Sequence, residues 1–153
     1  MLYDSLIFPQ LTYANIIWGN TYKTTLRPLF VAQKRVIRTI MYRNRLHHTN
    51  EDFKALKILK LGDINLYFGS NFVYKSLNSL TFPINYFSYS QNANYNLRNL
   101  NDLQPRFAGS TQGQSSPGFY CPLMYNELPA YIKNKPSISS FKLALRCHLL
   151  DKY

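Results

Sequence analysis

The chain is poor in acidic residues and cysteine, and it lacks a long apolar run. Its 153 residues hold 7 Asp and Glu against 18 Lys and Arg, for a formal net charge of +11 at pH 7. Cys121 and Cys147 lie far apart and form no C-x-x-C pair, so neither a disulfide framework nor a zinc knuckle is indicated and a reducing compartment is favoured. The N-terminus has no basic n-region, and no apolar run approaches the roughly 20 residues that span a bilayer. We therefore expect no signal peptide, no transmembrane helix and no membrane partner, and an intracellular protein of the nucleus or cytoplasm that is not secreted.

Residues that carry catalysis or bind cofactors are equally scarce. Glu51 and Asp52 are adjacent at an expected helix start, where the helix dipole explains them without catalysis. His47 and His48 have no further ligand at a metal-binding spacing, so solvent-facing or capping roles are favoured. No G-x-S-x-G, Walker-type or G-x-G-x-x-G loop occurs, and neither cysteine has an indicated base. The sequence predicts no catalytic residue, no metal site and no cofactor, and hence no enzyme that acts on its own.

Apolar residues and large rings are abundant. Hydrophobic residues make up 46% of the chain, with 13 Tyr and 10 Phe against 1 Trp, which suffices for one domain with a core. The rings suit a core or the stacking of bases. Trp18 is flanked by apolar residues at helical spacing, which favours an anchor in a core or hinge over a base-stacking platform.

A basic amphipathic helix is predicted over residues 24–45. Leu26, Leu29, Ile37 and Ile40 form its apolar face at about 100° per residue. No acid lies between Asp4 and Glu51, so a polyanion is the natural partner. Solvation of an ordinary helix surface is the competing explanation for the cations. The candidate nucleic-acid-binding residues are Arg27, Lys34, Arg35, Arg38, Arg43 and Arg45.

The helix boundaries follow from capping residues and prolines. The pattern of residues 2–18 predicts a helix kinked or restarted at Pro9. Thr24 or Thr25 is expected to cap the basic helix, with Pro28 in its first turn and its end near Arg43 to Arg45. One further helix is predicted from a capping box at Thr49 and Asp52 to Gly62, and the next from a cap at Asp63 to about Ser79. A short apolar helix is predicted before Pro129. The last predicted helix follows Pro136 and has Ile138, Phe141, Leu145 and Leu149 on one face.

The polar segment 83–118 is rich in Asn, Ser, Gln and Gly and reads as loop, with at most a short hairpin between residues 95–97 and 106–108. The fold class is therefore mainly α: a small bundle of four or five helices, a long irregular segment with at most one β-hairpin, and a C-terminal helix. We expect a basic helical bundle over residues 1–82, a loop-rich linker over 83–118 and a C-terminal helical segment over 119–153.

Seven short sequence blocks follow one another along the chain in this order: SLIFPQLTY, IIWGNTYKTTLRPLF, QKRVIRTI, HTNEDFKALKILKLGD, YNLR, YNELP and FK. Over nearly the whole chain this order resembles the region that follows the catalytic palm in reverse transcriptases of LINE-type, non-LTR retrotransposons. The matching positions are Ser5, Leu6, Ile7, Pro9, Leu11, Tyr13, Trp18, Gly19, Leu29, Gln33, Lys34, Ile37, Arg38, His48, Thr49, Phe53, Leu56, Leu61, Asp63, Tyr95, Asn96, Arg98, Asn126, Leu128, Pro129, Phe141 and Lys142. The chain departs from the family pattern at Ala14 and Cys121, where Gly is usual, and at Tyr125, where Trp is usual.

The resemblance implies a fragment of a transposable-element protein, an RNA-directed DNA polymerase whose catalytic palm is not part of this sequence. Residues 1–82 would correspond to the polymerase thumb, which lies along the template–primer duplex, and the rest to the post-polymerase region. The palm's metal-binding aspartates, with their Tyr- or Phe-Ala-Asp-Asp strand, and the family's endonuclease do not occur here. The implied partners are the backbone of RNA or an RNA–DNA hybrid and the missing palm.

Two further functions stay open at this point. The chain could be an inactive retroelement remnant, or a small protein-interaction module that docks a partner through its aromatic surface. An independent enzyme is the least favoured function, because no acid, base or metal ligand converges in the sequence.

Overall fold

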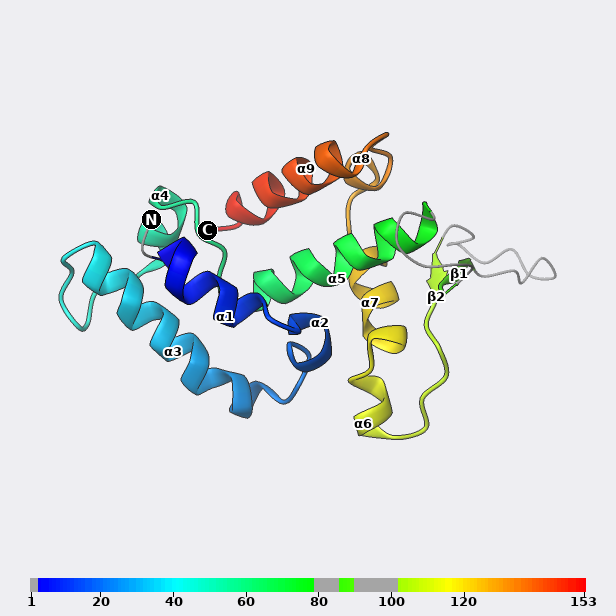
Figure 1. The fold of residues 1–153 in the computed structure, drawn as a ribbon, viewed down its shortest axis with the longest axis horizontal. Helices are drawn as coiled ribbons and strands as arrows, with labels where there is room; N and C mark the ends of the chain where they lie inside the picture. Colours follow the sequence, from blue (N-terminus) through cyan, green and yellow to red (C-terminus); the bar gives the residue numbers. More distant parts are fainter. Residues whose placement is uncertain (1–2, 79–85, 90–101) are drawn as a thin grey trace. The chain divides into compact units, whose positions relative to one another are not determined.

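The structure is a computed structural model that describes residues 3–78, 86–89 and 102–153 (Figure 1). These residues form one π-helical turn, nine α-helices and one two-stranded antiparallel sheet, which confirms the predicted mainly α fold with a short hairpin and a C-terminal helix. The chain divides into two compact units, Met1–Tyr67 with Leu143–Tyr153, and Phe68–Lys142. The division predicted from composition at residues 82 and 118 stays a prediction. No helix of the described residues is long and apolar enough to cross a membrane.

The first unit opens with three short helical pieces. The π-helical turn η1 (Tyr3–Ile7) leads directly into α1 (Phe8–Thr12), which has Pro9 in its first turn and so restarts the helix there as predicted. Helix α2 (Asn15–Trp18) follows Ala14, a residue in the left-handed region with φ 48°. The indole nitrogen of Trp18 donates a hydrogen bond to the carbonyl of Tyr13 at 2.7 Å, so this half-buried side chain anchors the turn between α1 and α2.

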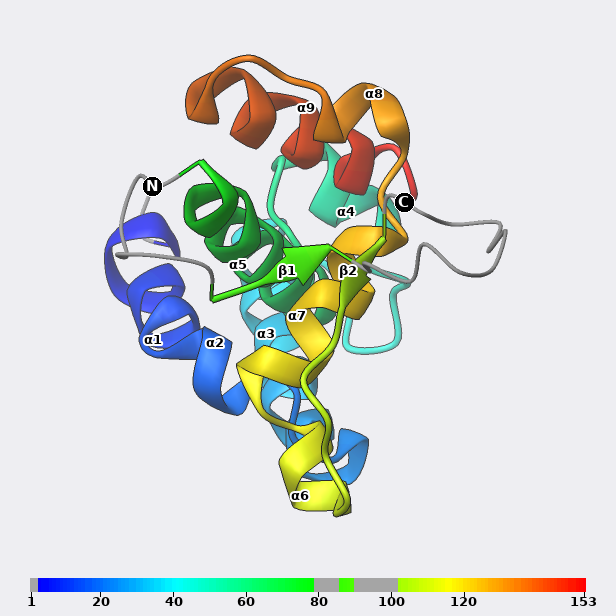
Figure 2. The same cartoon turned by 90° about the vertical axis from the view of Figure 1, so that its right-hand side faces the viewer.

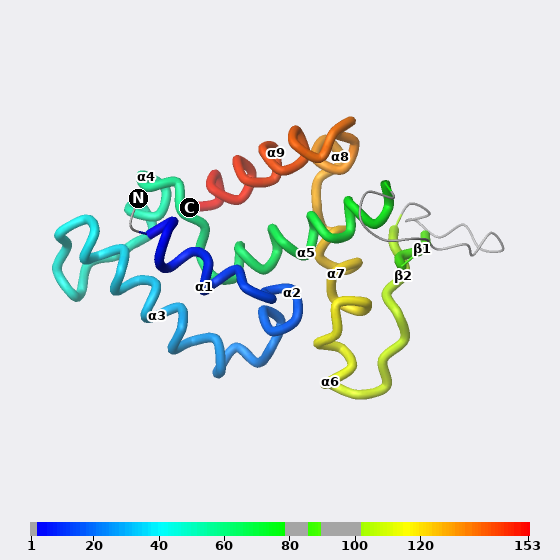
Figure 3. The backbone as a smooth tube through the Cα atoms, viewed as in Figure 1, coloured from blue at the N-terminus to red at the C-terminus, as the bar shows by residue number. Residues whose placement is uncertain are grey.

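Helix α3 (Lys23–Ile40) is the basic amphipathic helix, but its ends differ from those predicted. Tyr22 is the residue at its N-cap, so Pro28 lies inside the helix and not in its first turn. At the other end Arg43 N–H donates to the Arg38 carbonyl and Tyr42 N–H to the Thr39 carbonyl, while Tyr42 has φ 51°. This is a Schellman motif, which ends the helix before Arg43 and Arg45. Figure 3 follows the backbone out of α3 into the loop that precedes α4.

The predicted helix from Thr49 to Gly62 is shorter than expected. Helix α4 (Asn50–Ala55) has Thr49 at its N-cap, yet Thr49 makes no side-chain capping hydrogen bond, so the capping box does not form. Lys57, with φ 53°, ends α4 in a second Schellman motif, in which Ile58 N–H donates to the Phe53 carbonyl. Gly62 therefore does not stop this helix but lies in the first turn of α5 (Leu61–Leu77).

Asp63 is not the N-cap of α5 either. It lies in the first turn of that helix, and its carboxylate accepts a hydrogen bond from the Tyr153 hydroxyl at 2.6 Å. The same hydroxyl accepts from the backbone N–H of Lys60 at 2.8 Å. These two bonds hold the last residue of the chain against the start of α5.

The second unit contains the hairpin, at residues other than those predicted. Strand β1 (Ser88–Tyr89) pairs antiparallel with β2 (Leu103–Gln104), with Ser88 opposite Gln104 (Figure 2). The expected strand at 106–108 is irregular, and its expected partner at 95–97 lies outside the described residues. Asn126 explains the placement, because its side chain accepts from Leu103 N–H and donates to the Leu103 carbonyl, both at 2.9 Å. A side-chain amide thus binds β2 as a neighbouring strand would.

Four helices follow β2. They are α6 (Thr111–Gln114), α7 (Pro117–Asn126), α8 (Ala130–Lys133) and α9 (Ile138–Leu150). Pro129 is at the N-cap of α8. The apolar face predicted for the last helix is confirmed at Phe141, Leu145 and Leu149, which are fully buried, while Ile138 is half-buried.

The two cysteines should differ sharply in reactivity. Cys121 is buried and Cys147 exposed, and burial raises the pKa of the Cys121 thiol to about 12, against a smaller lowering by its hydrogen bond with Tyr120. Because the thiolate is the reactive form, we expect a thiol reagent near pH 8 to modify Cys147 rapidly and Cys121 only when the second unit opens. Mass spectrometry of timed samples from wild type and Cys147→Ser measures both rates. Equal rates for the two native thiols would contradict the buried environment of Cys121.

Candidate nucleic-acid interface

Three of the predicted cations lie on α3 and present their charge to solvent. Arg27 and Arg35 are exposed, and Lys34 is half-buried. The Lys34 amine lies 4.4 Å from the centroid of the Phe30 ring, which fixes its aliphatic stem beside the apolar face. None of these three forms an ion pair with a carboxylate in the described part of the chain. Their charges are therefore available to an external anion.

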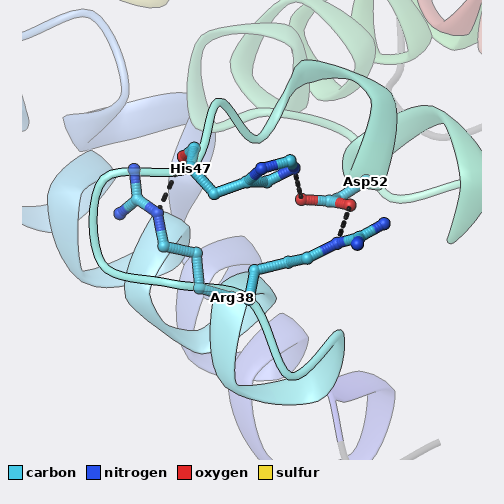
Figure 4. Close-up of polar contacts among 4 residues, drawn as sticks. Arg38, His47 and Asp52 are labelled. Carbon is cyan, nitrogen blue, oxygen red and sulfur yellow. Dashed lines mark hydrogen bonds and ion pairs between the residues drawn. The ribbon is translucent and has the colours of Figure 1, made fainter.

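Arg38 has a structural contact as well as a position on this surface. Its Nε donates to the carbonyl of His47 at 3.0 Å, across the loop that follows α3 (Figure 4). The bond uses one of the five N–H donors of the guanidinium. Arg38 thus ties the loop to the last turn of α3 while keeping its charge near the predicted interface.

Arg43 is held by a buried carboxylate. Asp52, with a side chain only 2% exposed, lies 3.4 Å from Nε of Arg43 and 3.4 Å from Nε2 of His47 (Figure 4). A buried carboxylate needs such partners, because an uncompensated charge inside a protein is costly. Asp52 therefore binds two side chains of the loop and does not cap α4. His47 contacts this carboxylate, whereas the sequence predicts a solvent-facing or capping role for it.

Arg45 does not share the face of Arg27, Lys34 and Arg38 as the helical wheel predicts. It lies in the loop beyond the end of α3, is exposed, and has no carboxylate partner among residues 3–78, 86–89 and 102–153. The predicted straight basic edge is thus a helix followed by an arginine-bearing loop. Arg43 and Arg45 belong to the loop and the other four cations to the helix.

Two cations that the sequence pattern missed lie close to Arg27. Lys23 opens α3 one residue before the predicted range, and Lys60 precedes α5; both line a cavity with Arg27. The pKa of Lys60 is lowered mainly by burial. The charge of Asp63 raises this pKa, and the charge of Lys34 lowers it further. Only tertiary structure brings Lys60 to this place, since nothing in its local sequence relates it to Arg27.

The described residues contain no group of three or more His, Cys, Asp or Glu side chains that could hold a metal ion. The cations of this surface offer contacts to anions. Arg supplies bidentate hydrogen bonds to phosphate, and Lys supplies a point charge.

Comparison with known proteins adds no family to this picture. No protein-family model, no curated protein and no solved structure matches the chain.

Proposed function

We propose that α3 and the loop after it bind the phosphate backbone of RNA or an RNA–DNA hybrid without sequence preference. The protein would be a thumb-like fragment of a non-LTR retrotransposon reverse transcriptase, inside the cell, without catalytic activity of its own. The observation that carries the proposal is that Arg27, Lys34 and Arg35 on α3 and Arg45 in the loop after it have no carboxylate partner in the described structure. Phosphate contacts by such cations supply most of non-specific nucleic-acid affinity.

Reversing two of these charges should flatten the salt dependence of binding. Arg27 and Arg35 are both exposed, so Arg27→Glu with Arg35→Glu changes charge without opening a core. Each lost phosphate contact lowers the slope of log affinity against log salt by about 0.7 to 0.9. We expect the slope to fall by roughly 1.4 to 1.8 for the double variant. Fluorescence anisotropy with a short RNA–DNA hybrid, single-stranded RNA and duplex DNA across salt concentrations measures it.

A matched control makes the same change of charge elsewhere. Lys75→Glu with Lys142→Glu reverses two charges in the second unit, and we expect it to leave most of the affinity and slope intact. Equal losses in both double variants would show that net charge alone governs binding. Unchanged binding of the Arg27/Arg35 variant would contradict the proposed interface.

Exposed apolar residues favour one alternative, a protein-interaction module. Tyr13, Ile17 and Tyr22 before α3, and Tyr42 and Leu46 after it, are all more than 60% exposed, and exposed side chains of this kind are the ones through which a partner protein would dock. This alternative, or an inactive remnant, predicts that the folded chain shows no salt-dependent binding to any of the three nucleic acids.

A further inference from the structure

The loop between α3 and α4 is tied down at both of its ends by arginine contacts. At its start, Arg43 N–H donates to the Arg38 carbonyl at 2.8 Å, which places these two arginines on one backbone turn. Near its end, the His47 carbonyl accepts from Nε of Arg38 at 3.0 Å. Asp52, in the first turn of α4, accepts from Nε of Arg43 at 3.4 Å (Figure 4). These contacts fix the loop against the last turn of α3.

Both arginines are held through the same atom, Nε. A guanidinium has five N–H donors, one on Nε and four on its two terminal nitrogens. The terminal nitrogens of Arg38 and Arg43 make no hydrogen bond to any residue that the structure describes, and the Arg43 side chain is 47% exposed. Two terminal nitrogens together form the edge that makes a bidentate contact with phosphate. This edge therefore stays free on each arginine while Nε anchors the group.

Asp52 is an acid bound to this arginine loop, and its burial decides what it does there. Its side chain is 2% exposed, whereas the neighbouring Glu51 is exposed. A buried carboxylate makes no contact with an external ligand, so it acts mainly through the side chains that it holds. Ordering a long side chain only when the ligand binds weakens affinity about two- to tenfold. Because Asp52 orders Arg43 beforehand, it removes part of that cost.

We propose that this loop is a preorganised phosphate-binding element and that Asp52 is its positioning residue. Asp52 holds Arg43 so that its terminal nitrogens meet a backbone phosphate, and the His47 carbonyl holds Arg38 in the same way. Asp52 thus strengthens binding although its charge has the same sign as that of the ligand. The inference rests on the proposed function, because it assigns a role within the same interface.

Asp52→Asn tests this role, with Glu51→Gln as its matched control. Each variant removes one negative charge, at adjacent residues of which the first is buried and the second exposed. We expect Asp52→Asn to weaken binding of a short RNA–DNA hybrid about two- to tenfold at every salt concentration, and Glu51→Gln to leave binding equal or slightly tighter. Because Arg43 still makes its contact, the slope of log affinity against log salt should not change in either variant. Fluorescence anisotropy across salt concentrations measures both quantities.

A double-mutant cycle with Arg43→Gln separates positioning from a purely structural role. Arg43→Gln alone removes one phosphate contact and should lower the slope by about 0.7 to 0.9. In that background no Arg43 is left to position, so adding Asp52→Asn should change the affinity by less than about twofold. A further loss as large as in the wild-type background would show that Asp52 only supports the fold, which would contradict the positioning role. Circular dichroism confirms that each variant is folded.

Arg43→Lys keeps the test decisive if Asp52→Asn does not fold. Lysine has the same charge but a single nitrogen, which cannot bind Asp52 and present a free pair of terminal nitrogens at the same time. We expect this variant to lose about two- to tenfold in affinity. Full retention of affinity would overturn the role assigned to the contact between Arg43 and Asp52.

The outcomes distinguish this inference from the proposed function. If the wild-type chain shows no salt-dependent binding to the hybrid or to single-stranded RNA, both are overturned. If the wild-type chain binds while folded Asp52→Asn binds equally or more tightly, only the positioning role is overturned. Asp52 would then act on the ligand as an ordinary negative charge.

Discussion

Replacing Gln33 by leucine is expected to lower the free energy of unfolding of the first unit by about 2 to 4 kcal/mol. Gln33 is 2% exposed, and its amide nitrogen donates to the Tyr3 hydroxyl at 2.8 Å and to the Leu59 carbonyl at 2.9 Å. Its amide oxygen accepts from Leu61 N–H at 3.0 Å. Leucine has a similar volume but makes none of these bonds, so three buried polar groups lose their partner at once.

Urea unfolding followed by the fluorescence of Trp18 measures this loss, because the chain has 1 Trp and it lies in the first unit. Gln10→Leu is the matched control: it makes the same change at an exposed residue of α1 in the same unit, and its effect should stay within about 0.5 kcal/mol. The Tyr3→Phe variant then completes a double-mutant cycle. Both single changes remove the same hydrogen bond between Gln33 and Tyr3. The losses in free energy of unfolding for Gln33→Leu and Tyr3→Phe should therefore add up to more than the loss for the double variant. A loss below about 1 kcal/mol for Gln33→Leu would contradict the role assigned to this amide.

The periodicity of residues 24–45 predicted α3 and its apolar face, but it did not predict where the helix ends. Glycine is the usual signal for a Schellman motif, because it adopts φ above zero without strain. Here Tyr42 and Lys57 adopt that conformation with φ 51° and 53°. Neither tyrosine nor lysine predicts a positive φ in the sequence. The helical pattern therefore predicts Arg43 and Arg45 in α3, which ends before them. Gly62 shows the opposite case: its residue type predicts the end of a helix, but it lies in the first turn of α5.

Contacts between segments that are distant in sequence are the second feature that the local pattern does not predict. A buried glutamine at position 33 breaks no helical pattern, and its bonds join residues 26 to 30 positions away. The same holds for Asn126, which places β2, and for Lys60, which reaches the cavity beside Arg27. By contrast, the residues buried in α9 lie on one periodic face, so local pattern alone predicted them correctly. Ala14 was missed for a local reason: it adopts a left-handed backbone, which glycine adopts without strain and which an alanine does not indicate.

Phe141→Ala is expected to lower the free energy of unfolding of the second unit by about 3 to 5 kcal/mol. Phe141 is fully buried, and its ring stacks on Tyr74 with a centroid distance of 4.3 Å and lies 6.2 Å from Tyr125. Tyr74 cannot move into the space left by the ring without breaking the hydrogen bond from its hydroxyl to the Lys135 carbonyl at 2.6 Å. The cavity left by alanine therefore stays largely open, which places the expected cost high in the range for such substitutions.

Modification of Cys121 during urea unfolding reports on this unit, since the thiol is buried there and becomes reactive when the unit opens. Phe107→Ala is the control: it deletes the same ring from a side chain that is 97% exposed, and it should cost no more than about 0.5 kcal/mol. Phe141→Leu keeps most of the buried carbon and should lose clearly less than alanine does, because cost follows the volume left empty. If Phe141→Ala and Phe107→Ala were equally stable, the ring stack would not be holding the second unit together. An early rise in Cys121 reactivity for Phe141→Ala alone would show that the unit opens where the stack was removed.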